Sequence, residues 1–247
     1  MSYCQTLRVQ GRTFIAGDLH GCLTPLESIL AGLQFSADKG DVCILLGDLT
    51  DRGPDSPGCL QLLDKPGFYS IQGNHEQMLC AALRDGDALA EYCWVRNGGN
   101  WFYELPKAEQ QQIRDHWLPK LEQLPLVIDL YTVDNVHVGI CHADPVFNDW
   151  QELLTALKEY KAKKRDDLIE KLVWSRERIS LANKTDLLSE AYRIKGIDWC
   201  VMGHTPIRPT PYRKGNCLWL DSGAVFPGGY LSVLEAGKDL HCHQASA

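Results

Sequence analysis

Five short polar clusters in this chain carry the side chains that most readily bind metal ions or transfer protons. They are residues 17–21 (GDLHG), 47–53 (GDLTDRG), 73–76 (GNHE), 141–144 (CHAD) and 203–206 (GHTP). Carboxylate, imidazole and amide groups suit borderline divalent metals such as Mn, Fe, Zn or Co. Because no cysteine stands at a ligand position in these clusters, their composition is not that of a structural zinc site.

The spacing of these residues fits a site for two ions. Asp18 and His20 stand two residues apart, so both side chains point to one face of an extended segment. The carboxylate of Asp48 has two oxygens and can bridge two ions, while Asn74 offers an oxygen without charge. A single Gly-Asp pair after a strand is usually only a turn. Five such clusters, each after a predicted strand, favour one shared site over five separate turns.

The elements that must position the first three clusters alternate along the chain. Apolar runs predict strands at residues 13–16, 41–46 and 68–71. Helical patterns follow them. Thr24 and Glu27 around Pro25 predict a capping box at the first helix start, and further helices start at Ser56 and near Glu76. This β-α-β-α-β order is typical of a parallel sheet.

The second half of the chain returns to strands. They are predicted at residues 126–131, 136–141, 199–202, 218–220 and 230–234. Short connections between some of them indicate antiparallel pairing. We therefore predict an α/β fold of two sheets with helices outside both. Because ligand sites in open α/β sheets lie beyond the carboxyl ends of strands, the five clusters are expected to converge.

Two further segments have helical patterns, at residues 108–124 and from 150 to about 171. The second contains the basic residues Lys158, Lys161, Lys163, Lys164 and Arg165. It is either a lid that bears on substrate choice or a solvated helix face. Since the chain has no internal repeat and no low-complexity linker, residues 1–247 are predicted to form one domain.

Composition and charge disfavour several classes of protein. The formal net charge of −7 argues against nucleic acid as the main partner, because such binders usually carry a basic face. No apolar run is long enough to span a membrane, and the first residues lack an apolar signal core. The ten cysteines form no CxxC pair, so we expect buried free thiols and a cytoplasmic location. The sequence indicates no oligomeric state.

Several candidate residues outside the clusters have simpler explanations. His116, His137 and the terminal pair His241 and His243 have surroundings typical of structural or solvated side chains. Arg176, within residues 174–178 (WSRER), is on its own typical of a charged helix end.

In this order, the five clusters resemble the signature of the phosphoprotein phosphatase family within the calcineurin-like metallophosphoesterases. Further segments are similar to the bacterial and bacteriophage-lambda type of serine/threonine protein phosphatase, namely GNHEQM at 73–78, NGGNWF at 97–102, WSRERI at 174–179 and DSGAVF at 221–226. The likeness runs over nearly the whole chain, and the combination is specific although each motif alone is weak. It implies a β-sandwich flanked by helices on both sides.

The resemblance implies a role for each position that matches the family pattern. The first metal would be held by Asp18, His20 and Asp48, and the second by Asp48, Asn74, His142 and His204. His75 would be the general acid, held by Asp51, while Arg52 and Arg176 would bind the phosphoryl oxygens. Mn2+ is the metal expected for this subgroup.

The activity implied by the resemblance is that of a protein phosphatase acting on phosphate monoesters. Its substrates would be phosphoserine and phosphothreonine in proteins or peptides, with phosphotyrosine as a further candidate. Two metals would lower the pKa of a bridging water, and the resulting hydroxide would attack phosphorus directly. No serine or cysteine nucleophile is then required.

Three alternative functions remain. A symmetrical dinucleoside tetraphosphatase shares the fold, but that group resembles GNHD at the third cluster and usually lacks the aspartate found here at Asp51; Glu76 and Asp51 both argue against it. A nuclease is disfavoured by the net charge of −7. A catalytically inactive phosphate-binding scaffold would be expected to have lost a ligand or the acid, and this chain keeps them all.

Overall fold

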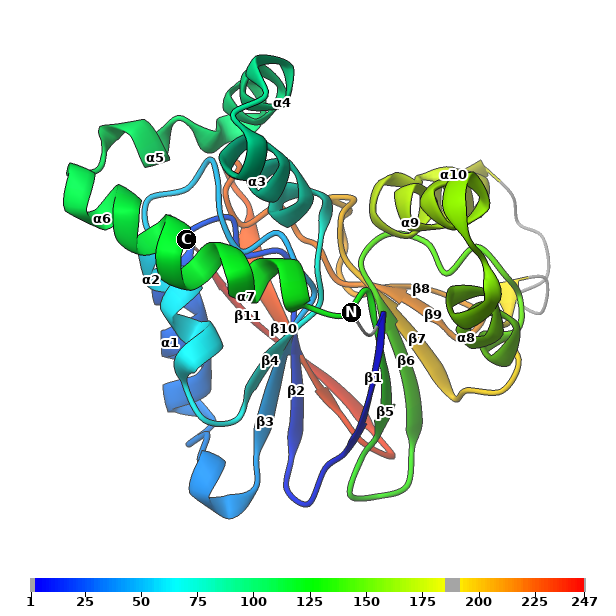
Figure 1. Cartoon of the computed structure of the whole chain (residues 1–247). Coiled ribbons are helices and arrows are strands. Elements are labelled where there is room, and N and C mark those ends of the chain that lie inside the picture. Colours follow the sequence, from blue (N-terminus) through cyan, green and yellow to red (C-terminus); the bar gives the residue numbers. More distant parts are fainter. Residues whose placement is uncertain (1–2, 185–191, 247) are drawn as a thin grey trace.

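The computed structural model describes residues 3–184 and 192–246 of the 247-residue chain. Within these residues, two β-sheets face each other and helices cover their outer sides (Figure 1). This arrangement confirms the predicted α/β class and the sandwich of two sheets flanked by helices.

The first sheet has five strands in the order β11-β10-β2-β3-β4. Its strands are β2 (Thr13–Ala16), β3 (Val42–Leu45), β4 (Phe68–Ser70), β10 (Tyr230–Ala236) and β11 (Leu240–Ser246). Strands β2, β3 and β4 are parallel, with Ala16 beside Leu45 and Leu45 beside Ser70. Because all three end at the same edge, the loops that follow them start side by side.

The second sheet has six strands in the order β1-β5-β6-β7-β9-β8. Its strands are β1 (Cys4–Arg8), β5 (Val127–Tyr131), β6 (His137–Cys141), β7 (Trp199–Met202), β8 (Tyr212–Lys214) and β9 (Cys217–Trp219). The short connections give antiparallel pairs, β5 with β6 and β8 with β9. Antiparallel pairing was predicted, although β8 itself was not. Strands β6, β7 and β9 are parallel, so their carboxyl ends also share an edge.

The helices form three groups. Beside the first sheet lie α1 (Leu23–Gly32) and α2 (Ser56–Gln61), and beside the second lie α8 (Trp150–Glu159), α9 (Ala162–Trp174) and α10 (Glu177–Lys184). A third group consists of α3 (Asn74–Asp85), α4 (Ala88–Trp94), α5 (Trp101–Glu104), α6 (Lys107–Gln112) and α7 (Leu118–Gln123). Two π-helical turns, Val95–Gly99 and Ile113–Trp117, continue α4 and α6, and two short 3-10 turns lie at Ala37–Lys39 and Leu62–Asp64.

The core between the sheets is aliphatic. It includes Ile15 and Ile44 from the first sheet and Ile128 and Ile140 from the second. Because side chains alternate along a strand, Phe14 points the other way and packs into the cluster formed with α1. Burial on both faces explains why the central strands are continuous apolar runs in the sequence.

Some sequence predictions need correction. Helix α1 begins at Leu23 after Cys22, and no side chain caps it, so the predicted capping box of Thr24 and Glu27 is wrong. The segment 150–171 is two helices rather than one, because the backbone is extended at Tyr160 and Lys161. Three strands were not predicted, β1, β8 and β11, and neither were helices α4 and α5.

The cysteine and membrane expectations can also be compared with the structure. All ten cysteines are free thiols, and most of them are buried. In residues 3–184 and 192–246, no helix has the length and apolar character needed to cross a membrane.

Candidate metal centre and active site

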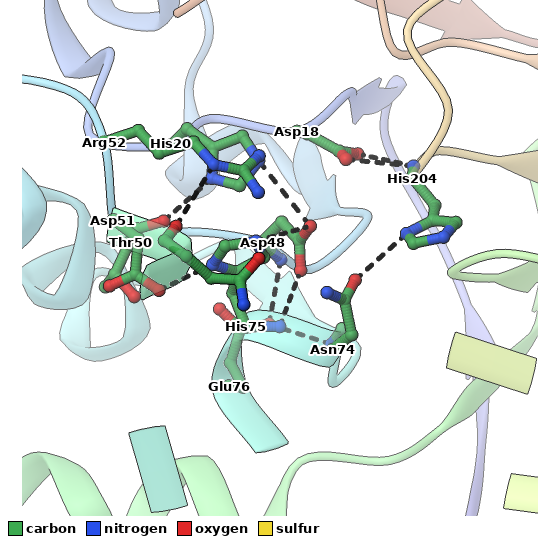
Figure 2. Close-up of polar contacts among 12 residues, drawn as sticks. Asp18, His20, Asp48, Thr50, Asp51, Arg52, Asn74, His75, Glu76 and His204 are labelled. Atoms are coloured by element: carbon green, nitrogen blue, oxygen red, sulfur yellow. Dashed lines mark hydrogen bonds and ion pairs between the residues drawn. The ribbon is translucent and has the colours of Figure 1, made fainter. Parts of the chain in front are cut away.

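The five polar clusters meet at one place, as the strand order requires. Asp18, Asp48 and Asn74 follow β2, β3 and β4 of the first sheet, and His142 and His204 follow β6 and β7 of the second. All five side chains are buried. Figure 2 shows most of these residues pointing toward a common centre.

One group of potential metal ligands is formed by His20, Asp48 and His75, whose ligand atoms lie within 4.8 Å of one another. His20 Nε2 is 3.6 Å from Asp48 Oδ2. His20 Nδ1 is 2.9 Å from the carbonyl oxygen of Thr50. Since a carbonyl can only accept, Nδ1 carries the hydrogen and Nε2 presents its lone pair to the centre.

A second group is formed by Asp48, His142 and His204, again within 4.8 Å. His142 donates from Nδ1 to the Leu46 carbonyl at 2.6 Å, and His204 donates from Nε2 to the Trp174 carbonyl at 3.1 Å. The centre is therefore faced by Nε2 of His142 but by Nδ1 of His204. Asp48 belongs to both groups, which is the place of a bridging ligand.

Asn74 joins the second group through its amide oxygen. Its Oδ1 lies 3.0 Å from both His142 Nε2 and His204 Nδ1. The Nδ1 atom of His204 carries a lone pair, because its hydrogen is on Nε2. Two lone pairs 3.0 Å apart repel each other unless a cation lies between them. This contact is what a divalent ion at this position would satisfy.

Asp18 is buried beside the centre but outside both groups. Its carboxylate accepts the backbone N–H of His204 at 2.9 and 3.1 Å. Burial, together with the carboxylates of Asp221 and Asp48, raises the pKa of Asp18 well above its usual value. Burial also raises the pKa of Asp221 to about 6. Three buried carboxylates in one place favour a positive ion, which would restore the charged form of Asp18.

The histidines differ in charge according to their neighbours. Burial lowers the pKa of His20 and of His204 to about 3, so both are neutral, as metal ligands must be. Burial also opposes protonation of His142, but Asp48 and Asp18 more than offset it and raise its pKa to about 10. Burial of Asp48 is likewise outweighed by the imidazoles of His142, His75 and His20, which hold the pKa of this carboxyl well below its usual range. The donor set therefore fits divalent ions that share Asp48.

His75 has a second interaction that the other imidazoles lack. Its Nδ1 lies 2.6 Å from Asp51 Oδ2, and both side chains are essentially fully buried. Its Nε2 faces the centre, 4.0 Å from Asp48 Oδ2. Distance alone admits His75 as a ligand in place of Asp18. The bond to Asp51 orients the ring in the way expected for a proton donor.

The two predicted arginines have different surroundings. Arg52 Nη1 donates to His20 Nε2 at 2.8 Å, and its Nε donates to the carbonyl of Asn97 at 3.2 Å. The positively charged guanidinium thus binds the lone pair of His20 that a metal ion would bind. Arg176 is exposed at the junction of α9 and α10, and its charge contributes to the lowered pKa of His204.

Two functional features escaped the sequence analysis. The buried carboxylate of Glu76 accepts the backbone N–H groups of Asp48, Leu49 and Gly73, each at 2.8 Å. It therefore joins the second and third loops, and the Gly-x-x-Glu spacing at a helix start was the signal that could have shown it. In addition, Arg178 pairs with Asp144 at 3.2 Å, which fixes the chain next to Arg176.

Comparison with known proteins agrees with this geometry. Residues 11–208 match the family model described as calcineurin-like phosphoesterase. The chain is 33% identical to serine/threonine-protein phosphatase 1 of Salmonella typhimurium, over 89% of each chain. It is 36% identical to serine/threonine-protein phosphatase 2 of Escherichia coli, over 87% of this chain and 88% of the relative.

More distant similarities extend to other activities. An asymmetrical bis(5'-nucleosyl)-tetraphosphatase of Oceanobacillus iheyensis is 27% identical, over 86% of this chain and 84% of that protein. The crystal structure of a cold-active protein-tyrosine phosphatase from Shewanella superposes with a TM-score of 0.62 at 18% identity, covering 99% of this chain and 82% of that one. At this identity, the structural likeness supports the fold alone.

Proposed function

Since the chain belongs to the calcineurin-like phosphoesterase family, we propose that it is a metal-dependent protein phosphatase that hydrolyses phosphate monoesters of serine and threonine residues in proteins. The observation that carries the proposal is the pair of buried ligand groups that share Asp48 next to the His75–Asp51 pair. A metal pair beside a buried imidazole–carboxylate pair is what hydrolysis of an alkyl phosphate requires, since its leaving group is poor.

The proposed ligands are those implied by the family resemblance, with Asp18 rather than His75 at the first ion. Asp18, His20 and Asp48 would hold the first ion, and Asp48, Asn74, His142 and His204 the second. Mn2+ is the proposed metal because of the resemblance to the bacterial and bacteriophage-lambda subgroup; the carboxylate, amide and imidazole ligands would also suit Fe, Zn or Co. When bound, such ions polarise phosphate oxygens and lower the pKa of a coordinated water.

The remaining residues act on the phosphoryl group and on the departing alkoxide. Arg52 and Arg176 would bind phosphoryl oxygens, since a guanidinium fork matches that geometry. His75 would donate a proton from Nε2 to the leaving oxygen. Asp51 holds its Nδ1–H and so keeps Nε2 directed at the centre. We propose that both sheets act as one domain, because each supplies part of this site.

The tetraphosphatase alternative is the weaker one. The tetraphosphatase relative, which is named asymmetrical, is less similar to this chain than the relatives named protein phosphatases. The two residues that distinguished these functions in the sequence, Asp51 and Glu76, both form hydrogen bonds at the site. Asp51 bonds to His75, and Glu76 binds three backbone N–H groups.

The test compares two substrates with leaving groups of different quality. In the Mn2+-loaded protein, His75→Asn should lower kcat for a phosphoserine peptide by about 10²-fold or more. The loss on p-nitrophenyl phosphate should be much smaller, because its phenolate leaves without protonation. His116→Asn is the matched control, since His116 forms an exposed pair with Asp64 away from the site. Equal losses on both substrates would remove His75 from the role of acid.

A further inference from the structure

Residues 94–101 pass directly over the His75–Asp51 pair, and the proposed mechanism gives them no role. This segment runs from the last residue of α4 through the π-helical turn Val95–Gly99 to the first residue of α5. It contains most of the NGGNWF motif that is similar to phosphatases in the sequence. The contacts of its two tryptophans and two glycines show what the motif holds in place.

Both tryptophans of the segment donate to Asp51. The indole Nε1 of Trp94 lies 3.0 Å from each carboxylate oxygen, and Nε1 of Trp101 lies 2.7 Å from Oδ1. His75 Nδ1 takes the remaining direction, 2.6 Å from Oδ2. Asp51 and Trp94 are completely buried. The carboxylate is thus fixed by three aromatic rings, of which only one is part of the proposed chemistry.

The backbone of the same segment holds the next residue, Arg52. The carbonyl of Gly98 accepts the backbone N–H of Arg52 at 3.2 Å, and the carbonyl of Asn97 accepts its Nε. Asp51 and Arg52 have φ angles of 76° and 71°, in the left-handed region. Two consecutive non-glycine residues in that region persist only where the surrounding structure holds them, since each costs about 1–3 kcal/mol.

The paired glycines allow this close approach. A Cβ on Gly98, which has a φ of 110°, would lie 2.6 Å from Cγ of Arg52. A Cβ on Gly99 would lie 2.4 Å from the indole ring of Trp94. Any side chain at these positions would therefore push the segment away from Arg52 or displace the indole that binds Asp51.

We propose that Trp94 and Trp101 are positioning residues of the phosphatase reaction, which fix the Asp51 carboxylate so that His75 presents Nε2 to the leaving group. The inference rests on the proposed function. Indoles suit this task because they donate without charge. An arginine or lysine in their place would bind Asp51 as well, but its positive charge would disfavour the proton that His75 must carry. Protonation of the leaving group therefore depends on a segment that supplies none of the proposed metal ligands.

The experiment removes each indole N–H while keeping an aromatic ring. Trp101→Phe and Trp94→Phe should each lower kcat for a phosphoserine peptide by about 10-fold, the lower end of the cost of losing a residue that orients a catalytic group. The kcat for p-nitrophenyl phosphate should change by less than about 2-fold, because that leaving group needs no proton. KM should be unchanged for both substrates, since both indole N–H groups donate to Asp51 and neither to a residue proposed to bind the phosphate.

The matched control is Trp150→Phe. Trp150 donates its indole N–H to the buried Asp129 at 2.8 Å, and Asp129 also binds a histidine, but this cluster is outside the site. Trp150→Phe should affect both substrates equally or not at all. Trp101 is only partly buried, so Trp101→Phe keeps the test available should Trp94→Phe fail to fold.

A double-variant comparison separates positioning from packing. In the Asp51→Asn background, Trp101→Phe should cause no further loss on the phosphoserine peptide, because the carboxylate it positions is gone. An additive loss, or equal losses on the two substrates, would overturn the inference. If His75→Asn shows the substrate difference but the tryptophan variants do not, only this inference fails. If His75→Asn shows none, the proposed role of His75 fails first.

Discussion

Two clusters in this molecule have the same three residue types but different surroundings. In one, Asp51 binds His75 at 2.6 Å together with the indoles of Trp94 and Trp101. In the other, Asp129 binds His137 at 2.6 Å together with the indole of Trp150. We call them the site cluster and the β5–β6 cluster. The distance between histidine nitrogen and carboxylate oxygen is the same in both clusters and does not distinguish them.

The clusters differ in which histidine ring nitrogen does not bind the carboxylate, and in the direction in which that nitrogen points. His75 binds its carboxylate through Nδ1, is 1% exposed, and turns Nε2 toward Asp48. His137 uses Nε2, is 22% exposed, and stacks on Tyr131 with ring centroids 4.2 Å apart. His137 is the first residue of β6, whereas His142 follows its last residue. His137 therefore lies at the amino end of the strand, away from the site. Position at the carboxyl ends of strands, not residue type, marks the site.

The largest effect is expected at Asp48, a neighbour that the β5–β6 cluster lacks. Asp48→Asn should remove charge from both ligand groups and lower activity by about 10²–10³-fold or more. Metal analysis after Mn2+ loading should give about two ions in the parent chain, as in two-metal sites. Asp48→Asn should weaken both, and His20→Ala mainly one. One ion per chain with full activity would contradict the shared site.

The second prediction compares the same substitution, aspartate to asparagine, in the two clusters. Asp51→Asn should lower kcat for a phosphoserine peptide by about 10²-fold, because His75 loses the partner that orients it as an acid. Asp129→Asn should leave kcat nearly unchanged and show its effect in the free energy of unfolding, by about 1–3 kcal/mol. Denaturant titration and steady-state kinetics on both variants measure this contrast. Similar kinetic losses would mean that the two clusters are equivalent supports.

The sequence predicted the site cluster only in part. Asp51 and His75 stand in motifs that follow apolar strands, so their types and places were both visible. Trp94 and Trp101 were not assigned, because an apolar residue in a helical region is indistinguishable from core until its N–H partner is seen. The role of Glu76 was missed for a similar reason, since its partners are backbone groups that no side-chain pattern reveals.

The fold was predicted best where burial is complete. Strands β2, β3 and β7 are almost fully buried and match the predicted ranges within a residue or two. Strands β1 and β11 consist of half-buried and exposed residues, and their mixed polar sequences lack the continuous apolar run of a buried strand. His241 and His243, interpreted as structural or solvated, lie in β11.

A smaller effect is expected in the number of protons that the histidines of the metal centre release when metal binds. Metal binding requires neutral imidazole, and a raised pKa of about 10 means that His142 is protonated below about pH 10 in the metal-free protein. Binding should therefore release a proton from His142 at about pH 8, and Asp18, whose carboxyl pKa is also raised, should contribute where it is still protonated. The apparent affinity should rise about tenfold per pH unit for each proton released. His20 and His204, with pKa values of about 3, release none in this range. Calorimetry in two buffers of different ionisation enthalpy gives the proton count, and a count of zero would contradict the assignment.

The smallest effect is expected from the basic residues between the β5–β6 cluster and Arg176. These residues are mostly exposed and lie on α8 (Lys158), on α9 (Lys163, Lys164 and Arg165) and in the link between the two helices (Lys161). Buried residues such as Leu153 and Leu172 fix both helices to the sheet. The role of this segment as a lid stays a prediction. Exposed charges act mainly on encounter with a charged substrate and are screened by salt.

Replacing these five residues by glutamine should raise KM for an acidic phosphopeptide by about 3-fold at low salt, in line with the small energies of exposed charge pairs. KM for p-nitrophenyl phosphate should not change, and added salt should abolish the difference. The control replaces five exposed lysines elsewhere, Lys39, Lys65, Lys107, Lys195 and Lys238, which changes the net charge equally. A rise in KM confined to the first variant would place an acidic peptide beside α8 and α9. An equal rise in both would show that only net charge matters, and no rise in either would leave the segment as a solvated helix face.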